Sequence, residues 1–288
     1  MNWLGWRKGY YLFSLLLILL SAFFIVRGGI QPSIEFTGGA TLRFDAQPKD
    51  VDKVQSAVSE VLSGEESHFS QDGNGIFVLD MQPKTNAQKD EIIQKIEEKT
   101  SSSVEEKSFQ TVGPSVGQEL IKKTFYAITA AIFVILAYVW LQFRDWRFGL
   151  GAILAMLHDS AILIGAYAAF GSFFGAKADI LFVTAILTVL SFSVHDTIVL
   201  FDQVRELRRS NARLGFEEIG NLATTQTLSR SVNNSVTILI MLFTLLILGG
   251  ESLRWFTAAL FVGTLVGTYS STFVALPLVL ELQRVRKK

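Results

Sequence analysis

The segment Ile180–Phe201 reads ILFVTAILTVLSFSVHDTIVLF, an apolar run that holds one adjacent pair of ionisable residues, His195 and Asp196. It is longer than the roughly 20 residues that a helix needs to cross the hydrocarbon core of a bilayer. An ionised side chain at that depth costs several kcal/mol unless it is paired or hydrated. The segment therefore predicts a membrane-spanning helix with a carboxylate that needs either a partner or a function.

Other apolar segments of similar length lie on both sides of this one. They are Gly9–Val26, Thr124–Phe143, Phe148–Ala176, Ser231–Gly250 and Trp255–Leu280. Only Phe148–Ala176 among them contains acidic or basic residues, the pair His158 and Asp159. Half of the 288 residues are hydrophobic and only 18% are charged. We therefore predict an α-helical polytopic membrane protein with six transmembrane helices. The apolar core of Gly9–Val26 is longer than that of a secretory signal peptide and no A-x-A cleavage site follows it, which favours a retained first span.

Basic residues sort to one side of the membrane once six spans are drawn with the N-terminus inside. That side holds Arg7, Lys8, Arg144, Arg147, Arg205, Arg208, Arg209, Arg213, Arg284, Arg286, Lys287 and Lys288. The positive-inside rule makes this side cytoplasmic. The sequence thus predicts that both termini and a connecting loop at 202–227 are cytoplasmic.

A soluble insertion separates the first two spans and is expected on the outer side. The expected domains are residues 1–27 as the first transmembrane helix, 28–119 as an external α+β domain and 120–288 as a five-helix transmembrane domain. Alternation and helical spacing predict strands at 33–44, 67–71, 75–81 and 103–112, with helices at 50–62 and 85–100. This βαββαβ order is typical of a ferredoxin-like domain.

Several kinds of chemistry are disfavoured by composition. The chain has no cysteine, and its three histidines lack the spacing of a metal-binding motif. It balances 26 Lys+Arg against 26 Asp+Glu, which disfavours a nucleic-acid binder. No P-loop, nucleophile elbow or dinucleotide-binding glycine pattern is present. We expect no enzymatic activity, no metal and no cofactor other than a coupling ion.

An ordered set of motifs resembles the SecF family, membrane subunits of the bacterial SecD–SecF complex of protein export and a branch of the resistance-nodulation-division superfamily. The matching segments are Glu35–Gly39, Val112–Gly117, Phe143–Phe148, Leu157–Asp159, His195–Val199, Phe201–Asp202, Thr227–Arg230, Gly249–Glu251 and Val266–Ser271. Two places depart from the family pattern. His195 stands where Asn is usual before the Asp, and Ser231–Asn234 replaces a more Thr-rich run.

The resemblance implies a proton-coupled translocase subunit in the bacterial cytoplasmic (inner) membrane. Such a subunit would pair with SecD and act with the SecYEG channel, with YajC as a further candidate partner. The proton motive force would assist the translocation of unfolded polypeptides, and membrane lipids would surround the helices. Two other functions remain open: a single-half exporter of small hydrophobic solutes, and a membrane assembly factor that transports nothing.

The candidate proton-coupling residues are Asp196 and Arg230. Asp196 lies about six residues before the cytoplasmic end of its span, hence roughly 9 Å deep. Burial disfavours an ionised carboxylate and a nearby guanidinium favours it, and this competition suits a proton carrier. Arg230 is expected at a similar level on the next helix, where an ion pair with Asp196 is sterically reasonable. The resemblance also implies a proton-coupled Asp and Arg at these positions. The alternatives are a structural ion pair and an arginine that snorkels to the headgroups.

Secondary candidates are Asp159, His158 and His195. Asp159 is either a proton relay or a helix-packing group. Because neighbouring residues on a helix differ by about 100° in direction, at most one of His158 and Asp159 is expected to face any given partner. His195 is more typical of a hydrogen-bonding residue that faces the bundle. Gly263, Gly267 and Ser271 repeat every four residues and predict close helix packing.

Overall fold

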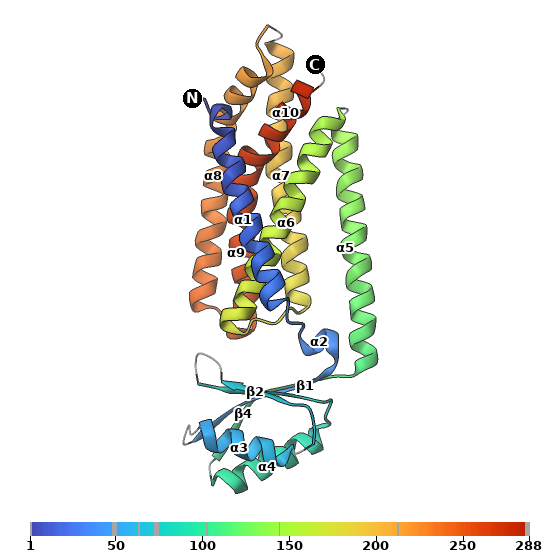
Figure 1. The fold of residues 1–288 in the computed structure, drawn as a ribbon, viewed down its shortest axis with the longest axis vertical. Coiled ribbons are helices and arrows are strands. Elements are labelled where there is room, and N and C mark those ends of the chain that lie inside the picture. The colour runs from blue at the N-terminus through green and yellow to red at the C-terminus, as the bar shows by residue number, and fades with distance from the viewer. Residues whose placement is uncertain are drawn as a thin grey trace. The chain divides into compact units, whose positions relative to one another are not determined.

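The computed structural model describes residues 2–47, 51–62, 64–71, 75–101, 103–143, 145–211 and 213–285. Arg144, Arg286, Lys287 and Lys288, used above to orient the chain, lie outside these ranges, as does Asp50 at the start of one predicted helix. The backbone divides into two compact units. One comprises Met1–Gln31 with Tyr126–Lys288, and the other comprises Pro32–Phe125 (Figure 1).

The six predicted spans correspond to six described helices that are long and apolar enough to cross a membrane. They begin with α1 (Arg7–Gly28), which follows a short 3-10 turn, η1 (Leu4–Trp6). The others are α5 (Pro114–Gln142), α6 (Trp146–Phe174), α7 (Ile180–Ser210), α8 (Phe216–Leu248) and α9 (Glu251–Ser270). The last continues through a π-helical turn, η2 (Ser271–Ala275), into α10 (Leu276–Val285).

The π-helical turn ends two residues before a proline. Pro277, near the start of α10, lacks the N–H that an α-helix would direct to the carbonyl of Phe273. A local departure from the α-helical pattern is therefore expected here. Such single wide turns occur frequently at functional sites.

Residues 202–227, predicted as a connecting loop, are instead helical over most of their length. Helix α7 runs through Ser210 and α8 begins at Phe216. The reason is local, because residues 203–209 (QVRELRR) are mostly strong helix formers. Gly215 is the N-cap residue of α8, and its backbone N–H donates to Glu218. Only residues 211–215 therefore lie between the two helices.

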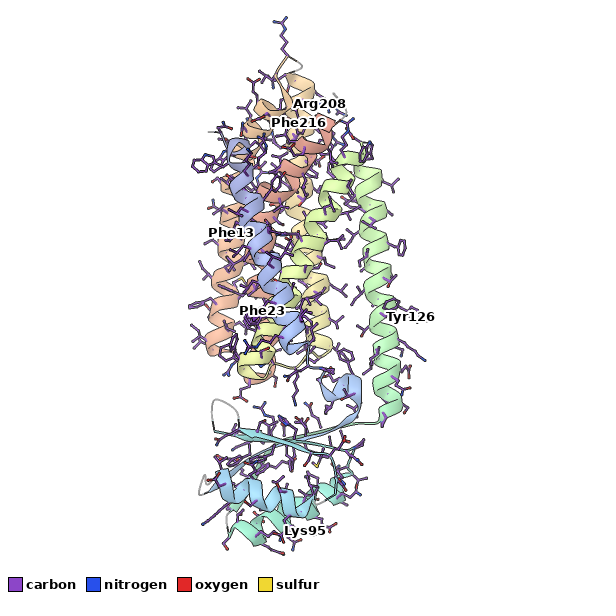
Figure 2. The ribbon with its side chains drawn as sticks, viewed as in Figure 1. Phe13, Phe23, Lys95, Tyr126, Arg208 and Phe216 are labelled. Carbon is purple, nitrogen blue, oxygen red and sulfur yellow. The ribbon has the colours of Figure 1, made fainter. Side chains whose placement is uncertain are left out.

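The first unit has central and peripheral helices. Most of the apolar stretch of α6 and of α9 is buried within the unit, whereas almost none of the corresponding stretches of α5 and α8 is buried. Phe148, Phe201 and Leu276 belong to one buried cluster of this bundle, and Tyr167 and Phe182 belong to another. Figure 2 shows the side chains that project from α1, with Phe13 and Phe23, both more than half exposed, labelled on it. The peripheral helices thus present apolar side chains, as lipid-facing helices do.

The second unit contains a four-stranded antiparallel sheet against which two helices pack. Its strands are β1 (Gly39–Gln47), β2 (His68–Gln71), β3 (Phe77–Met81) and β4 (Ser103–Val112), in the spatial order β2-β3-β1-β4. The helices are α3 (Val51–Val61) and α4 (Asn86–Thr100), so the elements follow the predicted βαββαβ order. Alternate residues of β1 and β3 are buried and pack with Val54, Val58, Ile92 and Ile96 of the helices.

The start of the first strand differs from the prediction of a strand over 33–44. Residues Ile34–Thr37 form a short helix, α2, and β1 begins only at Gly39. Ser33 caps this helix by accepting a hydrogen bond from the backbone N–H of Glu35. Gly38 and Gly39 follow with φ of 74° and 137°, conformations that favour glycine and allow the chain to turn into the strand. A serine cap before two glycines is a helix-and-turn signal that the alternation of apolar residues concealed.

Candidate functional site

Two buried carboxylates lie inside the helical bundle. Asp159 on α6 is fully buried and Asp196 on α7 is 8% exposed. Both residues lie in apolar helices long enough to span a membrane. Because such groups need polar partners at membrane depth, the contacts of each define what it can do.

Asp196 is bonded to α8 by a single described hydrogen bond. Ser231 Oγ donates to its Oδ2 over 2.5 Å. The carboxylate borders a cavity of about 260 Å³ between α7, α8 and the π-helical turn. The polar residues that line this cavity are His195, Asp196, Thr227, Arg230, Ser231, Asn234, Ser271 and Thr272. The site therefore combines a titratable carboxyl group, a guanidinium and space sufficient for water.

The predicted ion pair between Asp196 and Arg230 is not formed. Arg230 is exposed and lines the same cavity, but no ion pair joins it to Asp196 in the described part of the chain. Successive residues of a helix point about 100° apart, and Ser231 is the residue that points at the carboxylate. His195 is also exposed and lines this cavity. The structure thus gathers the three predicted residues around one cavity with the serine, rather than the arginine, in contact.

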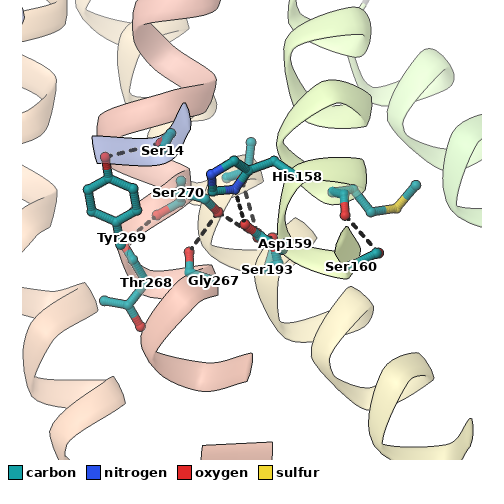
Figure 3. Close-up of polar contacts among 12 residues, drawn as sticks. Ser14, His158, Asp159, Ser160, Ser193, Gly267, Thr268, Tyr269 and Ser270 are labelled. Atoms are coloured by element: carbon teal, nitrogen blue, oxygen red, sulfur yellow. Dashed lines mark hydrogen bonds and ion pairs between the residues drawn. The ribbon is translucent and has the colours of Figure 1, made fainter. Parts of the chain in front are cut away.

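Asp159 is the centre of a network that joins three helices (Figure 3). Its Oδ2 accepts hydrogen bonds from Ser193 Oγ of α7 and Ser270 Oγ of α9, each over 2.5 Å. Its Oδ1 lies 2.8 Å from Nδ1 of the preceding residue, His158. The two neighbours therefore contact each other and share one network, which the expectation from helix geometry did not anticipate. His158 is itself 7% exposed, and its Nε2 is buried with no hydrogen-bond partner among the described residues.

The two carboxylate sites are one helical turn apart. Ser193 contacts Asp159, and Asp196 follows three residues later on α7, a rise of about 4.5 Å. On the facing helix, Ser270 contacts Asp159, while the next residue, Ser271, lines the Asp196 cavity. Of these two adjacent serines, Ser270 thus belongs to the Asp159 site and Ser271 to the Asp196 cavity.

The small-residue stripe brings α9 against α7. A Cβ atom added to Gly263 would lie 2.1 Å from Val189 Cγ2, and one added to Gly267 would lie 3.3 Å from Ser193 Cβ. Ser271 is buried and donates to the carbonyl of Thr268. The close approach at Gly267 is what places Ser193 and Ser270 within reach of the same carboxylate.

Ser193, Ser231 and Ser270 were missed as site residues by the sequence analysis. Each is a small polar residue in an apolar helix, and such residues often form hydrogen bonds between membrane helices. Ser193 lies three residues before Asp196, and Ser270 precedes a residue of the small-residue stripe, so spacing marks both as candidates but does not indicate that their partner is Asp159. Within the ranges described, no group of three or more His, Cys, Asp or Glu side chains could hold a metal ion.

Six apolar helices with carboxylates buried among them, and a small α+β unit between the first and second, define a multi-pass membrane protein. Residues 92–285 match the family model described as protein export membrane protein SecD/SecF, C-terminal. The chain is 37% identical to the protein translocase subunit SecF of Thermobaculum terrenum, over 94% of this chain and 90% of the relative. It is 36% identical to that of Haemophilus influenzae, over 96% and 84%.

A solved structure from the same family is also similar to this chain. The crystal structure of SecDF, a translocon-associated membrane protein from Thermus thermophilus, superposes with a TM-score of 0.84 at 33% identity. That similarity covers 99% of this chain and 39% of the longer SecDF chain. The chain therefore belongs to the SecD/SecF family of protein export membrane proteins.

Proposed function

We propose that this chain is the SecF-type subunit of a SecD–SecF protein translocase that uses proton flow to assist export of unfolded polypeptides. Relatives that match nearly its whole length are named protein translocase subunit SecF. The Thermus thermophilus relative is named SecDF, and this chain covers 37% of it. A SecD protein is therefore the first proposed partner, and SecYEG and YajC are further ones.

The membrane placement is part of the proposal. The basic side of the bundle faces the cytoplasm, both termini lie there, and the membrane is the bacterial inner membrane. The α+β unit between α1 and α5 is then an external, ferredoxin-like domain that meets the exported polypeptide. Its sequence between Arg27 and Gln118 carries more acidic than basic residues.

The observation that carries the proposal is the Asp196 cavity. A buried carboxyl group that has one described hydrogen bond, with a guanidinium in the same cavity, can change its contacts when it gains or loses a proton. The ionised carboxylate attracts the Arg230 guanidinium, and the neutral acid does not. Such a change biases helix positions when two arrangements differ by only a few kcal/mol. One charge crossing 100 mV supplies about 2.3 kcal/mol, which is of that size.

The test is protein export in vesicles that contain this chain, SecD and SecYEG under an imposed proton gradient. Asp196→Asn should abolish the gradient-dependent part of export while co-purification with SecD is preserved. Glu206→Gln, which neutralises an exposed acid on the same helix α7, is the matched control and should export normally. Unchanged export by the Asp196→Asn protein would remove Asp196 from the mechanism. Failure to co-purify any SecD-like protein would favour the solute-exporter alternative instead.

A further inference from the structure

We infer that His158 and Asp159 form a second proton-binding site of the bundle, one helical turn from Asp196, whose state is transmitted to α9 through Ser270. The inference rests on the proposed function only in assuming that protons enter the bundle. It stands on the geometry of the Asp159 network (Figure 3).

The neighbours of Asp159 can all donate hydrogen bonds to its ionised form. The Ser193 and Ser270 hydroxyls both donate to Oδ2, and an N–H at His158 Nδ1 can donate to Oδ1. An ionised carboxylate only accepts hydrogen bonds, so each of these donors has a suitable acceptor. Three donors on one buried carboxylate compensate its loss of hydration.

The same side chains can also form hydrogen bonds with the protonated form of Asp159, after one hydroxyl group rotates. When Oδ2 carries the proton, it can donate to Ser270 Oγ. The hydroxyl hydrogen of Ser270 then turns to the carbonyl of Gly267, which already lies 3.3 Å away. The carboxyl group itself therefore has hydrogen-bond partners among Ser193, Ser270 and His158 in both of its states.

His158 supplies a route for the proton. Its Nε2 is buried and has no hydrogen-bond partner among the described residues. A proton that arrives at Nε2 forms an N–H bond there, while the Nδ1–H bond breaks and its proton passes to Asp159 Oδ1. The imidazole stays neutral in its other tautomer, and the carboxylate becomes a carboxylic acid with its proton on the oxygen that faces His158. Rotation of the carboxyl group about its Cβ–Cγ bond then exchanges the two oxygens and brings this proton to the Ser270 hydroxyl. Both ring nitrogens of histidine are suited to such a transfer.

In the described part of the chain, the charged and titratable groups around this site come from three helices. Helix α6 contributes His158, and α7 carries Asp196 in the turn after Ser193. From α9, the Tyr269 ring lies 6.5 Å from the imidazole, and its hydroxyl donates to the Tyr10 carbonyl of α1 and pairs with Ser14 Oγ. The described polar partners of Asp159 are therefore His158, Ser193 and Ser270.

A change in the protonation of Asp159 can reach the Asp196 cavity through α9, because the residues involved are consecutive in the chain. Ser270 is the last residue of α9, and the π-helical turn begins at Ser271. Ser271 and Thr272 line the Asp196 cavity. A reversal of the Ser270 hydrogen bond therefore acts at the start of the wide turn that borders the first proton site. Neutralising one carboxylate should in this way change the proton affinity of the other.

The test uses the purified full chain in lipid bilayers, with infrared absorption of the protonated carboxyl group recorded across a pH titration. Wild type should show a band that Asp159→Asn removes and a separate band that Asp196→Asn removes. Ser270→Ala should move the midpoint of the Asp159 band by about one pH unit towards higher pH, since the ionised form loses a hydrogen bond to a charged group and the neutral acid loses only a weaker one. Ser160→Ala is the matched control on α6, because the one described hydrogen bond of the Ser160 hydroxyl is to the Met156 carbonyl.

The outcomes separate the inference from the proposed function. A folded Asp159→Asn protein that keeps every titrating band of the wild type overturns the inference, even if Asp196→Asn still abolishes export. If Asp159→Asn does not fold, Ser270→Ala and His158→Gln decide instead. A shifted midpoint in both supports the second site, and midpoints equal to that of Ser160→Ala overturn it.

Discussion

Ser231 Oγ donates a 2.5 Å hydrogen bond to Asp196 Oδ2, joining α8 to α7 inside the apolar bundle. Arg230, one residue earlier, borders the same cavity but makes no ion pair with this carboxylate in the described part of the chain. The serine thus joins the two helices at this level, and the guanidinium takes no part in that bond.

Loss of the serine donor should alter the pH dependence of export. Ser231→Ala removes a hydrogen bond to a charged group, which contributes about 1.5–3 kcal/mol. The pH of half-maximal gradient-driven export should therefore rise by about one unit, because the ionised carboxylate is less stable. Thr237→Ala on the same helix, whose hydroxyl donates to its own backbone at Asn233, is the control. Identical pH profiles for the two proteins would contradict the prediction.

Arg230 should affect activity far more than stability. It is exposed and has no ion pair with Asp196, so Arg230→Gln should change the free energy of unfolding by no more than about 0.5 kcal/mol. Gradient-driven export should nevertheless be lost. Thermal unfolding of the purified protein and vesicle export measure the two effects. A large loss of stability would instead favour an assembly factor whose charges only hold helices together.

Close packing of α9 on α7 should make Gly263 intolerant of a methyl group. In Gly263→Ala the added Cβ would overlap the side chain of Val189, and overpacking typically costs about 1–3 kcal/mol. Gly149→Ala on α6 is the same substitution at a helical glycine with no atom within 4 Å of the added Cβ. It should leave stability unchanged or raise it, because alanine favours a helix by up to about 1 kcal/mol. Equal thermal midpoints for the Gly263→Ala and Gly149→Ala proteins would contradict close contact between Gly263 of α9 and Val189 of α7.

The core of the α+β unit should depend on Phe77. This side chain of β3 is fully buried between Phe44 and Phe69, with ring centroids 5.5 Å from each. Phe77→Ala should cost about 3–5 kcal/mol. Hydrogen exchange of the β1 and β3 amides in the full chain should rise accordingly. Val51→Ala, at a side chain 37% exposed, is the control and should leave this exchange unchanged.

The two ion pairs of Lys89 in the α+β unit should contribute to stability only below alkaline pH. Hydrogen bonds to Asp90 (2.8 Å) and Glu106 (2.5 Å) raise the pKa of Lys89. A raised pKa in the folded state means that the contribution is fully present below the unfolded value, about 10.4, and is lost as pH rises through the folded value. The wild type should therefore lose more stability than Lys89→Met in this alkaline range. Repeating the comparison in a Glu106→Gln background should reduce the difference, and an undiminished difference would exclude the Glu106 contact.

Much of the fold follows from local features of the sequence. Hydropathy predicts the six helices because each must be apolar over about 20 residues wherever it lies in the bundle. Alternation and helical spacing likewise predict the βαββαβ order of the α+β unit. The strand start at Gly39 and the helical extension of α7 were mispredicted. At both places capping and helix propensity, rather than apolar spacing, determine the structure.

The sequence by itself determined that Asp159 and Asp196 lie in apolar helices and therefore need polar partners. Only the tertiary structure decided which residues are those partners. The donors to Asp159 are Ser193 and Ser270, 34 and 111 residues away in the chain, and the donor to Asp196 is Ser231, 35 residues away. A hydrogen bond requires heavy atoms within about 3 Å, a condition that depends on helix rotation and close packing at glycines. Hydropathy and motif spacing do not constrain helix rotation or close packing, because they describe residues along one helix rather than across two.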